Sequence, residues 1–414
     1  MRFDVLVLGG GIVGTALALD LALRGKSVGL IERKSPGGET SFGNAGLIQS
    51  EAVMPYPFPR DPYLLLQYAL NLKPEANYHL ADVFEVAPFL WRYFRASTRE
   101  GQLRTAAANA PLFGACLDEH SRLAKAAGAE AMLRRGGWIK AFRSQSALDA
   151  YLDETKRDLA HFGIAYDVLD GEGLRAREPH LSDVIVGAVH WTTPYSLNDP
   201  EALTLAYAQH FQTLGGRILH GDAMTLNEER DGWSVAAEGQ RVSAPDCVVA
   251  LGPWAPDLLR PMGYKVPMGV KRGYHVHMRP KGNASLGVPV LDADNGYMMV
   301  PMARGIRLTS GAEFAGRDSK PTPVQIDKIE PFARELMPLE GRVEAQPWMG
   351  ARPCMPDMLC VAGKAPRHKG LWFNFGHAHH GLTLAGSCAR LLGEMITGET
   401  PFTDPTPYSL ARFN

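Results

Sequence analysis

The sequence predicts an α/β protein in two parts, one built on a parallel sheet and one, of α+β type, built on a mixed or antiparallel sheet. Two observations predict the first part: residues 3–8 form a short apolar strand, and a glycine turn, a helical run over 12–24 and a second apolar strand over 26–32 follow it. A strand–helix–strand unit implies a right-handed crossover and therefore parallel strands. The third observation is that residues 270–278 and 297–310 alternate as longer antiparallel strands do.

The remaining elements follow in order along the 414 residues, which suffice for about two or three domains. Residues 54–91 are rich in proline, aromatic residues and leucine, so we interpret them as an excursion from the first sheet. The strands after residue 215 suggest that the chain returns to the first sheet there. We expect helices over 103–133, 144–162, 199–214, 324–336 and 381–396, short strands and turns over 163–194, and strands over 216–219, 233–237 and 246–251.

The composition is that of a soluble globular protein. The 43 basic and 44 acidic residues nearly cancel, which excludes an overall field that would gather nucleic acid or an anionic membrane. The five cysteines are widely spaced, with no CxxC pair and no zinc-like grouping with histidine, so we expect a reducing compartment, the cytoplasm, and no metal. The apolar segment 5–23 is neither a signal peptide nor a membrane span, because Asp20 interrupts it.

The glycine turn carries the first functional signal. Gly9, Gly11 and Gly14 form GxGxxG after a strand and at the start of a helix, where the backbone can receive a pyrophosphate. Glu32 ends the second strand 18 residues after Gly14 and is placed to accept hydrogen bonds from a ribose diol. Its carboxylate, followed by Arg33, favours an unphosphorylated ribose. The motif predicts a dinucleotide but does not choose between NAD and FAD.

The next segment, ETSFGNAGLI over 39–48, favours a flavin. Its small residues and free backbone N–H groups would let a loop lie against a cofactor, although read alone it is also compatible with a surface turn. It resembles the loop that follows the second strand in the D-amino acid oxidase superfamily of flavoproteins. The resemblance implies contacts with FAD at Ser41, Asn44, Ala45, Gly46 and Leu47.

Three further stretches match that superfamily in the expected order: VVALGPWA over 248–255, GARP over 350–353 and FGHAHHGLTLAG over 375–386. Gly252 would allow close backbone approach, and a helix starting at Gly381 would stabilise an anionic reduced flavin. The resemblance also implies cofactor contacts at Ala223, Leu382 and Thr383. It favours non-covalent FAD, while a flavin link at Cys354, close to the cysteine of sarcosine oxidase-like relatives, stays open.

The resemblance implies a domain organisation in which neither part is continuous in sequence. A Rossmann-like FAD-binding domain would comprise residues 1–50, 196–256 and 346–414. A substrate-binding domain of α+β type would comprise residues 51–195 and 257–345.

The same resemblance assigns candidate substrate residues. Arg352 corresponds to the arginine that clamps the substrate carboxylate, for which a guanidinium fork is well suited. Tyr297 falls where glycine oxidase-like members place a tyrosine that supports this carboxylate, and Tyr274 is a weaker candidate. His379 can line the substrate pocket, and we prefer this interpretation to a metal site formed with His377 and His380.

Among its relatives the chain is most similar to bacterial D-amino acid dehydrogenases of the small-subunit type, and more distantly to glycine and sarcosine oxidases. This implies oxidation of a D-amino acid to the 2-oxo acid and ammonia by hydride transfer to FAD, with electrons passed to a quinone or an electron-transfer protein. Two alternatives stay open: oxidation of a secondary amine such as sarcosine or proline, and a non-catalytic flavin-binding subunit. Residues 54–91 either cover the substrate or dock peripherally at the inner face of the inner membrane.

Overall fold

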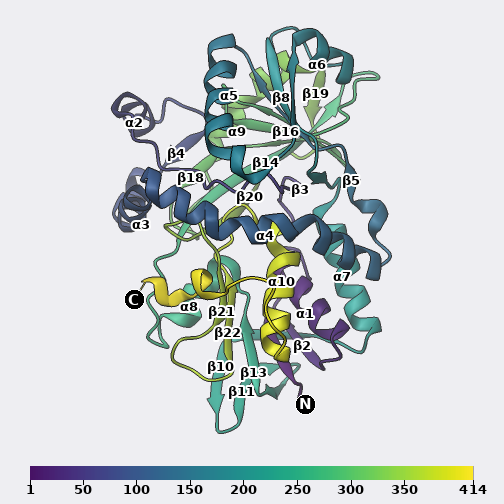
Figure 1. The fold of residues 1–414 in the computed structure, drawn as a ribbon, viewed down its shortest axis with the longest axis vertical. Helices are drawn as coiled ribbons and strands as arrows, with labels where there is room; N and C mark the ends of the chain where they lie inside the picture. Colours follow the sequence, from purple (N-terminus) through teal and green to yellow (C-terminus); the bar gives the residue numbers. More distant parts are fainter. Residues whose placement is uncertain (414) are drawn as a thin grey trace.

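The computed structural model describes residues 1–413, which form two large sheets joined by long helices (Figure 1). The first sheet has eight strands in the order β12-β11-β10-β2-β1-β13-β22-β21, and its central strands β10, β2, β1, β13 and β22 are parallel. This confirms the predicted parallel sheet. Its strands are β1 (Val5–Leu8), β2 (Val28–Glu32), β10 (Arg217–Glu229), β11 (Gly232–Ala237), β12 (Gln240–Ala244), β13 (Asp246–Val249), β21 (Val361–Lys364) and β22 (Leu371–Phe375).

Four helices cover one face of this sheet, and together they form its largest apolar cluster. The helix α1 has so few polar residues because it is buried on nearly every side, including the fully buried Ala16, Leu17 and Leu19. A second cluster on the other face includes α8 (Ala255–Leu259). The four helices are α1 (Ile12–Leu23), α4 (Arg99–Ala126), α7 (Pro200–Thr213) and α10 (Gly381–Thr397).

The second sheet has eleven strands and is mostly antiparallel. Its main path is β4-β18-β14-β17-β16-β15-β6-β8-β7, and β19 and β20 also pair with β14. The helix α9 packs its apolar face, including Ile326 and Ile329, against this sheet. The strands are β4 (Ala76–Tyr78), β6 (Trp138–Phe142), β7 (Tyr166–Asp170), β8 (Gly187–Trp191), β14 (Gly269–Pro280), β15 (Val290–Asp292), β16 (Tyr297–Met302), β17 (Gly305–Thr309), β18 (Ala312–Phe314), β19 (Leu339–Arg342) and β20 (Trp348–Cys354); the helices beside them are α5 (Gln145–Leu159), α6 (Gly171–Arg177) and α9 (Val324–Leu336).

A small third sheet pairs β9 (Tyr195–Ser196) with β3 (Leu47–Ile48) and with β5 (Arg134–Arg135). The helix α4 crosses the middle of the molecule in Figure 1, between the two halves. Its buried Cys116, Leu123 and Ala124 join the core of the first sheet. In its packing the helix therefore belongs to the half built on the first sheet.

The excursion over residues 54–91 forms α2 (Pro62–Ala69), β4 and most of α3 (Val83–Ala96) at one side of the molecule (Figure 1). Asp61 caps α2 by accepting a hydrogen bond from the Leu64 amide at 2.7 Å. The outer surfaces of these helices are strongly apolar: the exposed fraction is 90% for Phe84, 76% for Leu80 and 61% for Trp91. This apolar surface is unusual for a protein that has to stay in solution.

Four elements differ from the sequence prediction. The helix predicted over 103–133 is α4, which begins four residues earlier at Arg99 and ends seven residues earlier at Ala126. The segment predicted as short strands and turns over 163–194 contains the helix α6. Residues 297–310 form two strands, β16 and β17, joined by a tight turn, and not one long strand. The strand β20 belongs to the second sheet, because it pairs with β14 along Gly269–Tyr274, although its residues were expected in the first part. The domain division itself stays a prediction.

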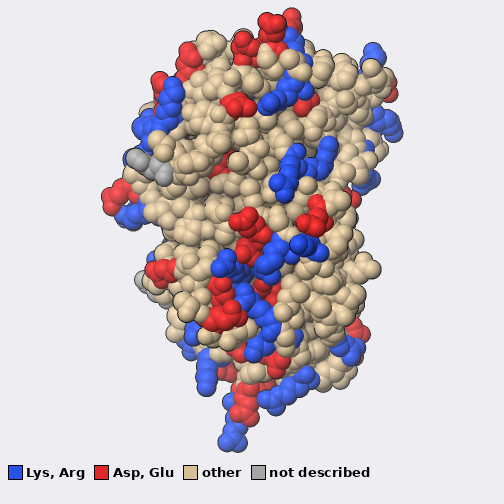
Figure 2. Space-filling view, turned by 45° about the vertical axis from the view of Figure 1, so that its right-hand side comes forward, with Lys and Arg blue, Asp and Glu red and all other residues tan. Residues whose placement is uncertain are grey.

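The distribution of charged side chains and the character of the helices agree with what the composition predicts. On the face in Figure 2, Lys and Arg side chains alternate with Asp and Glu, so no wide area of one sign is visible there. Over residues 1–413, no helix combines the length and the apolar character needed to cross a bilayer.

Candidate active site

A single large cavity of about 1070 Å³ is lined by residues of both large sheets and of the excursion. It begins at the glycine turn after β1 and extends to β14, β20 and the turn before α10. Ligand pockets for small molecules typically measure about 300–1,000 Å³. The volume therefore suits a dinucleotide together with a small substrate.

Glycine is required at two positions of the turn after β1. A Cβ on Gly14 would lie 1.9 Å from the Gly9 carbonyl oxygen, and Gly9 has φ +105° with the Ala250 oxygen 2.5 Å from where its own Cβ would be. Both positions exclude any side chain. The turn thus brings bare backbone to the cavity at the N-terminus of α1, as a pyrophosphate requires.

Glu32 is held in place beside this turn. Its carboxylate accepts hydrogen bonds from the backbone amides of Gly10 at 2.6 Å and Lys34 at 2.8 Å, one on each oxygen. Each oxygen keeps a further lone pair for a ribose hydroxyl. Next to it, the Arg33 guanidinium stacks on Trp254, 4.3 Å from the ring centroid. This is the geometry expected for the end of β2 in a dinucleotide site.

The loop over 41–46 is fixed by hydrogen bonds at both ends. Ser41 Oγ accepts from the Ile12 amide at 3.0 Å, and Asn44 Oδ1 accepts from the Gly46 amide at 2.8 Å. The buried Arg307 guanidinium donates to the carbonyl oxygens of Phe42 and Asn44, at 3.3 and 2.6 Å. The loop is therefore held in place against the cavity without any ligand contact.

Most of the predicted cofactor residues meet at the cavity. Those that line it are Gly9, Gly11, Glu32, Arg33, Ser41, Asn44, Ala45, Leu47, Ala223, Gly252, Gly381 and Leu382. Gly14, Gly46 and Thr383 lie behind this wall. Thr383 donates to the Leu47 carbonyl and accepts from the Gln49 amide, both at 3.2 Å, so it joins α10 to β3.

At the other end of the cavity, Arg352 extends from β20 across β14. Its guanidinium covers Gly273, where a Cβ would lie 2.2 Å from Nη2, so the missing side chain leaves room for it. Nη1 donates to the Gly311 carbonyl at 3.0 Å, and within residues 1–413 the guanidinium has no carboxylate partner. An enclosed guanidinium in this state is suited to bind an anion.

His379 lines the same end of the cavity. Burial lowers its pKa well below the ordinary value, and the charges of His380, Arg352 and Lys271 act in the same direction. Its Nε2 atom is buried and has no hydrogen-bond partner among the described residues. The ring also contacts Tyr56, with 5.2 Å between the centroids. His379 is therefore a neutral imidazole with one free polar atom.

The two tyrosines do not match their expected roles. The Tyr274 side chain borders the cavity, but its hydroxyl donates to Glu313 at 2.6 Å and accepts from the Thr322 amide at 2.9 Å. Tyr297 is buried in the apolar cluster beneath α9 and does not line the cavity, whereas its neighbour Met298 does. Alternate residues of a strand face opposite sides, so Met298 faces the cavity and Tyr297 faces the core.

Two lysines at this end were missed by the sequence analysis. Lys271 and Lys140 both line the cavity, and burial lowers the pKa of each ammonium group to about 8. A lysine on a strand usually reaches water, so the sequence gives no signal until the pairing of the strands is known. The only hint is the doublet Lys271-Arg272, since one of two adjacent residues on a strand must face inward.

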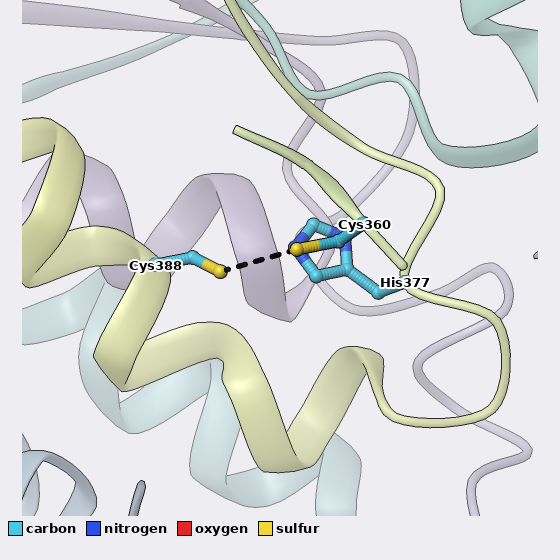
Figure 3. Close-up of side chains that lie close together, drawn as sticks. All are labelled: Cys360, His377 and Cys388. Atoms are coloured by element: carbon cyan, nitrogen blue, oxygen red, sulfur yellow. Dashed lines mark hydrogen bonds between the residues drawn. The ribbon is translucent and has the colours of Figure 1, made fainter. Parts of the chain in front are cut away.

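The turn before α10 contacts two cysteines. The donor atoms of Cys360, His377 and Cys388 lie within 4.8 Å of one another, and the two sulfur atoms are 4.0 Å apart (Figure 3). The hydrogen bond to Cys360, together with burial, raises the pKa of the Cys388 thiol well above its ordinary value. Sequence spacing did not reveal this group, which offers three ligands where a structural zinc site uses four.

Cys354 lies on the cavity wall, and burial raises the pKa of its thiol. The five cysteines are all buried and unbridged.

The geometry therefore fits FAD: a glycine cradle that a Cβ would fill, a fixed carboxylate for the ribose, and a cavity that continues to an unpaired arginine. The sequence pattern of the DAO family of FAD-dependent oxidoreductases matches residues 4–395. The chain belongs to this family, and it is an FAD-dependent oxidoreductase.

Individual relatives are similar over their whole length. A D-amino acid dehydrogenase from Rhizobium johnstonii is 31% identical, with 99% of each chain covered. A D-amino-acid oxidase from Bradyrhizobium diazoefficiens is 27% identical over 99% of this chain and 98% of the relative. The crystal structure of glycine oxidase from Geobacillus kaustophilus has the same fold, with a TM-score of 0.75, 22% identity and 99% of each chain covered.

Proposed function

We propose that this enzyme oxidises a D-amino acid to the 2-oxo acid and ammonia and passes the electrons to an acceptor of the respiratory chain. The observation that carries the proposal is the guanidinium of Arg352, which lines the cavity and has no carboxylate partner among the described residues. Relatives named D-amino acid dehydrogenase and D-amino-acid oxidase support this donor class. When bound, FAD would supply the acceptor for the hydride that leaves the α-carbon.

The protein residues would position the substrate. Arg352 binds the α-carboxylate through two parallel hydrogen bonds, which fixes the face that the α-carbon presents. His379 is neutral, so its ring can accept a hydrogen bond from the substrate amino group, while its lowered pKa disfavours accepting a proton. An amine that binds in its deprotonated form needs no further base. The lining of the cavity, mostly apolar, keeps water from the reacting carbon.

The excursion supports an acceptor in the membrane. Its inner residues, among them Leu65, Tyr68 and Leu90, line the cavity, while Phe84 and Trp91 lie on its exposed apolar surface. Leu80 does both, since it borders the cavity and is 76% exposed. A surface of this kind would dock at the headgroup region of a bilayer and bring the cavity close to a membrane quinone. The excursion would then both cover the substrate and attach the enzyme peripherally.

Replacing Arg352 with lysine tests the proposal. Lysine keeps the charge but loses the fork, so we expect kcat/KM with D-alanine to fall about 100-fold, or about 2.7 kcal/mol of transition-state stabilisation, while FAD content stays unchanged. The measurement is steady-state turnover with a quinone-like acceptor. Arg104→Lys is the matched control, because Arg104 pairs with Glu100 on the exposed surface of α4.

Unchanged kinetics for Arg352→Lys would contradict the assignment. A panel of D-alanine, L-alanine, D-proline and sarcosine, followed by anaerobic bleaching of the flavin, tests the donor class. Bleaching by sarcosine or proline alone would replace the D-amino acid with a secondary amine. Absence of bleaching by every amine would mean a non-catalytic flavoprotein, and turnover with oxygen alone would remove the respiratory acceptor.

A further inference from the structure

Lys271 and Arg272 are neighbours on β14 but have very different surroundings. Arg272 is fully buried, and its guanidinium is paired with the equally buried carboxylate of Glu313, with Nε and Oε2 2.7 Å apart. Lys271 faces the opposite side and lines the cavity. Within residues 1–413 no carboxylate pairs with its ammonium group, whose nearest recorded partners are the rings of Tyr93 at 4.0 Å and Phe314 at 5.9 Å. The charge of Arg272 is therefore neutralised by Glu313, whereas the charge of Lys271 is not neutralised by an ion pair.

A second unpaired cation lies directly opposite. Lys271 and Arg352 are register partners on β14 and β20, and both line the cavity. Like charges opposed across two strands disfavour the folded state. Burial lowers the pKa of Lys271 to about 8, and the charge of Arg352 acts in the same direction, while Cys354 acts in the opposite one. A bound anion would relieve both effects.

The two cations lie at different points of the wall. The Arg352 guanidinium covers Gly273, two residues further along β14, while the Lys271 ammonium lies over the ring of Tyr93 on α3. A carboxylate held by the fork of Arg352 therefore leaves the Lys271 charge for a second anionic group.

The acidic residues that line the cavity form no ion pair with Lys271 or Arg352, although one of them, Glu75, keeps a buried Oε2 atom without a partner among the described residues. Glu32 accepts from two backbone amides beside the glycine turn, and Glu39 forms an ion pair with Lys34 at 2.7 Å. Glu75 accepts from the Tyr68 hydroxyl at 3.3 Å, and Asp222 accepts from the Met224 amide at 2.9 Å. None of the four forms an ion pair with Lys271 or Arg352.

We propose that Lys271 forms a second anion subsite, and that the preferred substrates are amino acids whose side chain carries a carboxylate, such as D-glutamate and D-aspartate. The inference rests on the proposed function, in which Arg352 takes the α-carboxylate. Lys271 binds the side-chain carboxylate as a point charge, and the rings of Tyr93 and Phe314 limit how much water surrounds it.

The test compares acids with their isosteric amides. In the wild-type holoenzyme we expect kcat/KM for D-glutamate to exceed that for D-glutamine by about 10-fold to 100-fold. Lys271→Met keeps the length of the side chain and removes its charge. It should lower kcat/KM for D-glutamate by about 10-fold to 100-fold more than kcat/KM for D-glutamine, so that the preference for the acid is lost, and Lys271→Arg should retain part of the preference. FAD content and thermal stability of each variant confirm folding.

Two results would overturn the inference. Equal rates with acid and amide in the wild type would show that no second anion is recognised. Equal losses with both substrates in Lys271→Met would show that Lys271 shares the α-carboxylate with Arg352.

A readout without turnover separates this inference from the proposed function. Glutarate, a dianion that lacks an amino group, should perturb the flavin spectrum with a lower dissociation constant than butyrate, and Lys271→Met should remove the difference. Tighter glutarate binding together with no oxidation of any D-amino acid would support the subsite and reject the proposed activity. Oxidation of D-alanine together with equal binding of the two acids would support the activity and reject the subsite.

The pH profile gives a further readout. Because the pKa of Lys271 is about 8, the preference for the acid over the amide in kcat/KM should decrease as the pH rises through 8. Of the groups beside Lys271, burial raises the pKa of the Tyr93 hydroxyl and of the Cys354 thiol, and burial lowers the pKa of His379. Lys140 lines the same cavity and also has a pKa of about 8, so the decrease should be absent from Lys271→Met, in which Lys140 is retained. A pH-independent ratio would count against Lys271 as the second cation.

Discussion

Side chains one position apart on a strand face opposite sides of the sheet. This alternation determines which residues of the site could be predicted from the sequence. Arg352 was predicted, because its motif is local and the resemblance of GARP supplies its role. Lys271 was not, because its meaning depends on the pairing of β14 with β20. Tyr297 was placed in the site by analogy, and the alternation of β16 turns it into the core instead. A local motif can be recognised in the sequence, whereas the side of the sheet to which a strand residue points cannot.

Glu51 is a buried acid that forms no ion pair with a cation within residues 1–413. It is 4% exposed, and its Oε1 atom accepts from the Trp138 indole at 2.8 Å and from the Gln49 amide at 2.9 Å. Its Oε2 atom has no partner within residues 1–413. Burial raises the pKa of this carboxyl to about 7. The folded protein therefore holds a proton on Glu51 that the unfolded chain releases near its ordinary pKa.

Glu51→Gln should remove a pH-dependent loss of stability. In the folded protein the pKa of Glu51 is about 7, which lies above the ordinary value of 4.5. Below pH 4.5 the carboxyl is protonated in the folded and the unfolded chain, so the free energy of unfolding is not reduced. As the pH rises from 4.5 towards 7, the unfolded chain releases this proton more readily, and the free energy of unfolding falls. The full shift corresponds to about 3 kcal/mol. We expect the variant to unfold at a higher temperature than the wild type at pH 8 but not at pH 5, as measured by calorimetry.

Glu399→Gln is the control, because Glu399 is 54% exposed and pairs with Arg24 at the surface. It should change the unfolding temperature little at either pH. An equal stability difference between Glu51→Gln and the wild type at both pH values would contradict the account of Glu51.

Among the elements, long segments with one strong period were predicted well and short ones were not. The apolar pattern and the positions of glycines predicted the ends of four helices to within one or two residues: α1, α7, α9 and α10. The helix α6 has two glycines in seven residues, and it forms because Asp170 caps it and Leu174 is buried beneath it. The turn between β16 and β17 lacks the Asn-Gly or Asp-Gly pair that signals a hairpin, and Gly305 follows it with φ +130°. Tertiary contacts decide such cases.

The helix α3 carries the prediction that belongs to this scale. Phe84 and Trp91 are 90% and 61% exposed, so replacing both with glutamate should abolish binding to vesicles of anionic bacterial lipid, as measured by cosedimentation. Turnover with a soluble acceptor should be unchanged, because neither residue lines the cavity.

A matched control uses exposed apolar residues outside the excursion, Leu205→Glu and Leu214→Glu, which are each 43% exposed on and beside α7. These changes should leave vesicle binding intact. Equal vesicle binding by the wild type and the Phe84/Trp91 variant would refute membrane docking through α3.

At the scale of the whole molecule, FAD binding should stabilise the folded state. A ligand that binds only the folded protein stabilises it by about 4 kcal/mol at a thousandfold excess over its dissociation constant. We therefore expect removal of FAD to lower the unfolding temperature, and re-addition to restore it. Gly14→Ala should lose this response, since its Cβ would lie 1.9 Å from the Gly9 oxygen.

Gly114→Ala is the matched control, because nothing lies within 4 Å of the added methyl group on α4. It should keep FAD binding and the shift in unfolding temperature. A full shift in Gly14→Ala would show that the cradle does not depend on bare backbone at this position.

The order of strands in the first sheet also bears on how the protein is made. The strand β1 pairs with β13, which in turn pairs with β22, so the sheet joins residues 5–8 to residues 246–249 and 371–375. The helix α10, which begins at the cavity, follows later still. Contacts so distant in sequence form slowly. During translation the glycine turn emerges first but has no complete binding site for FAD until residues beyond 380 have left the ribosome, so capture of the cofactor is a late event in biosynthesis.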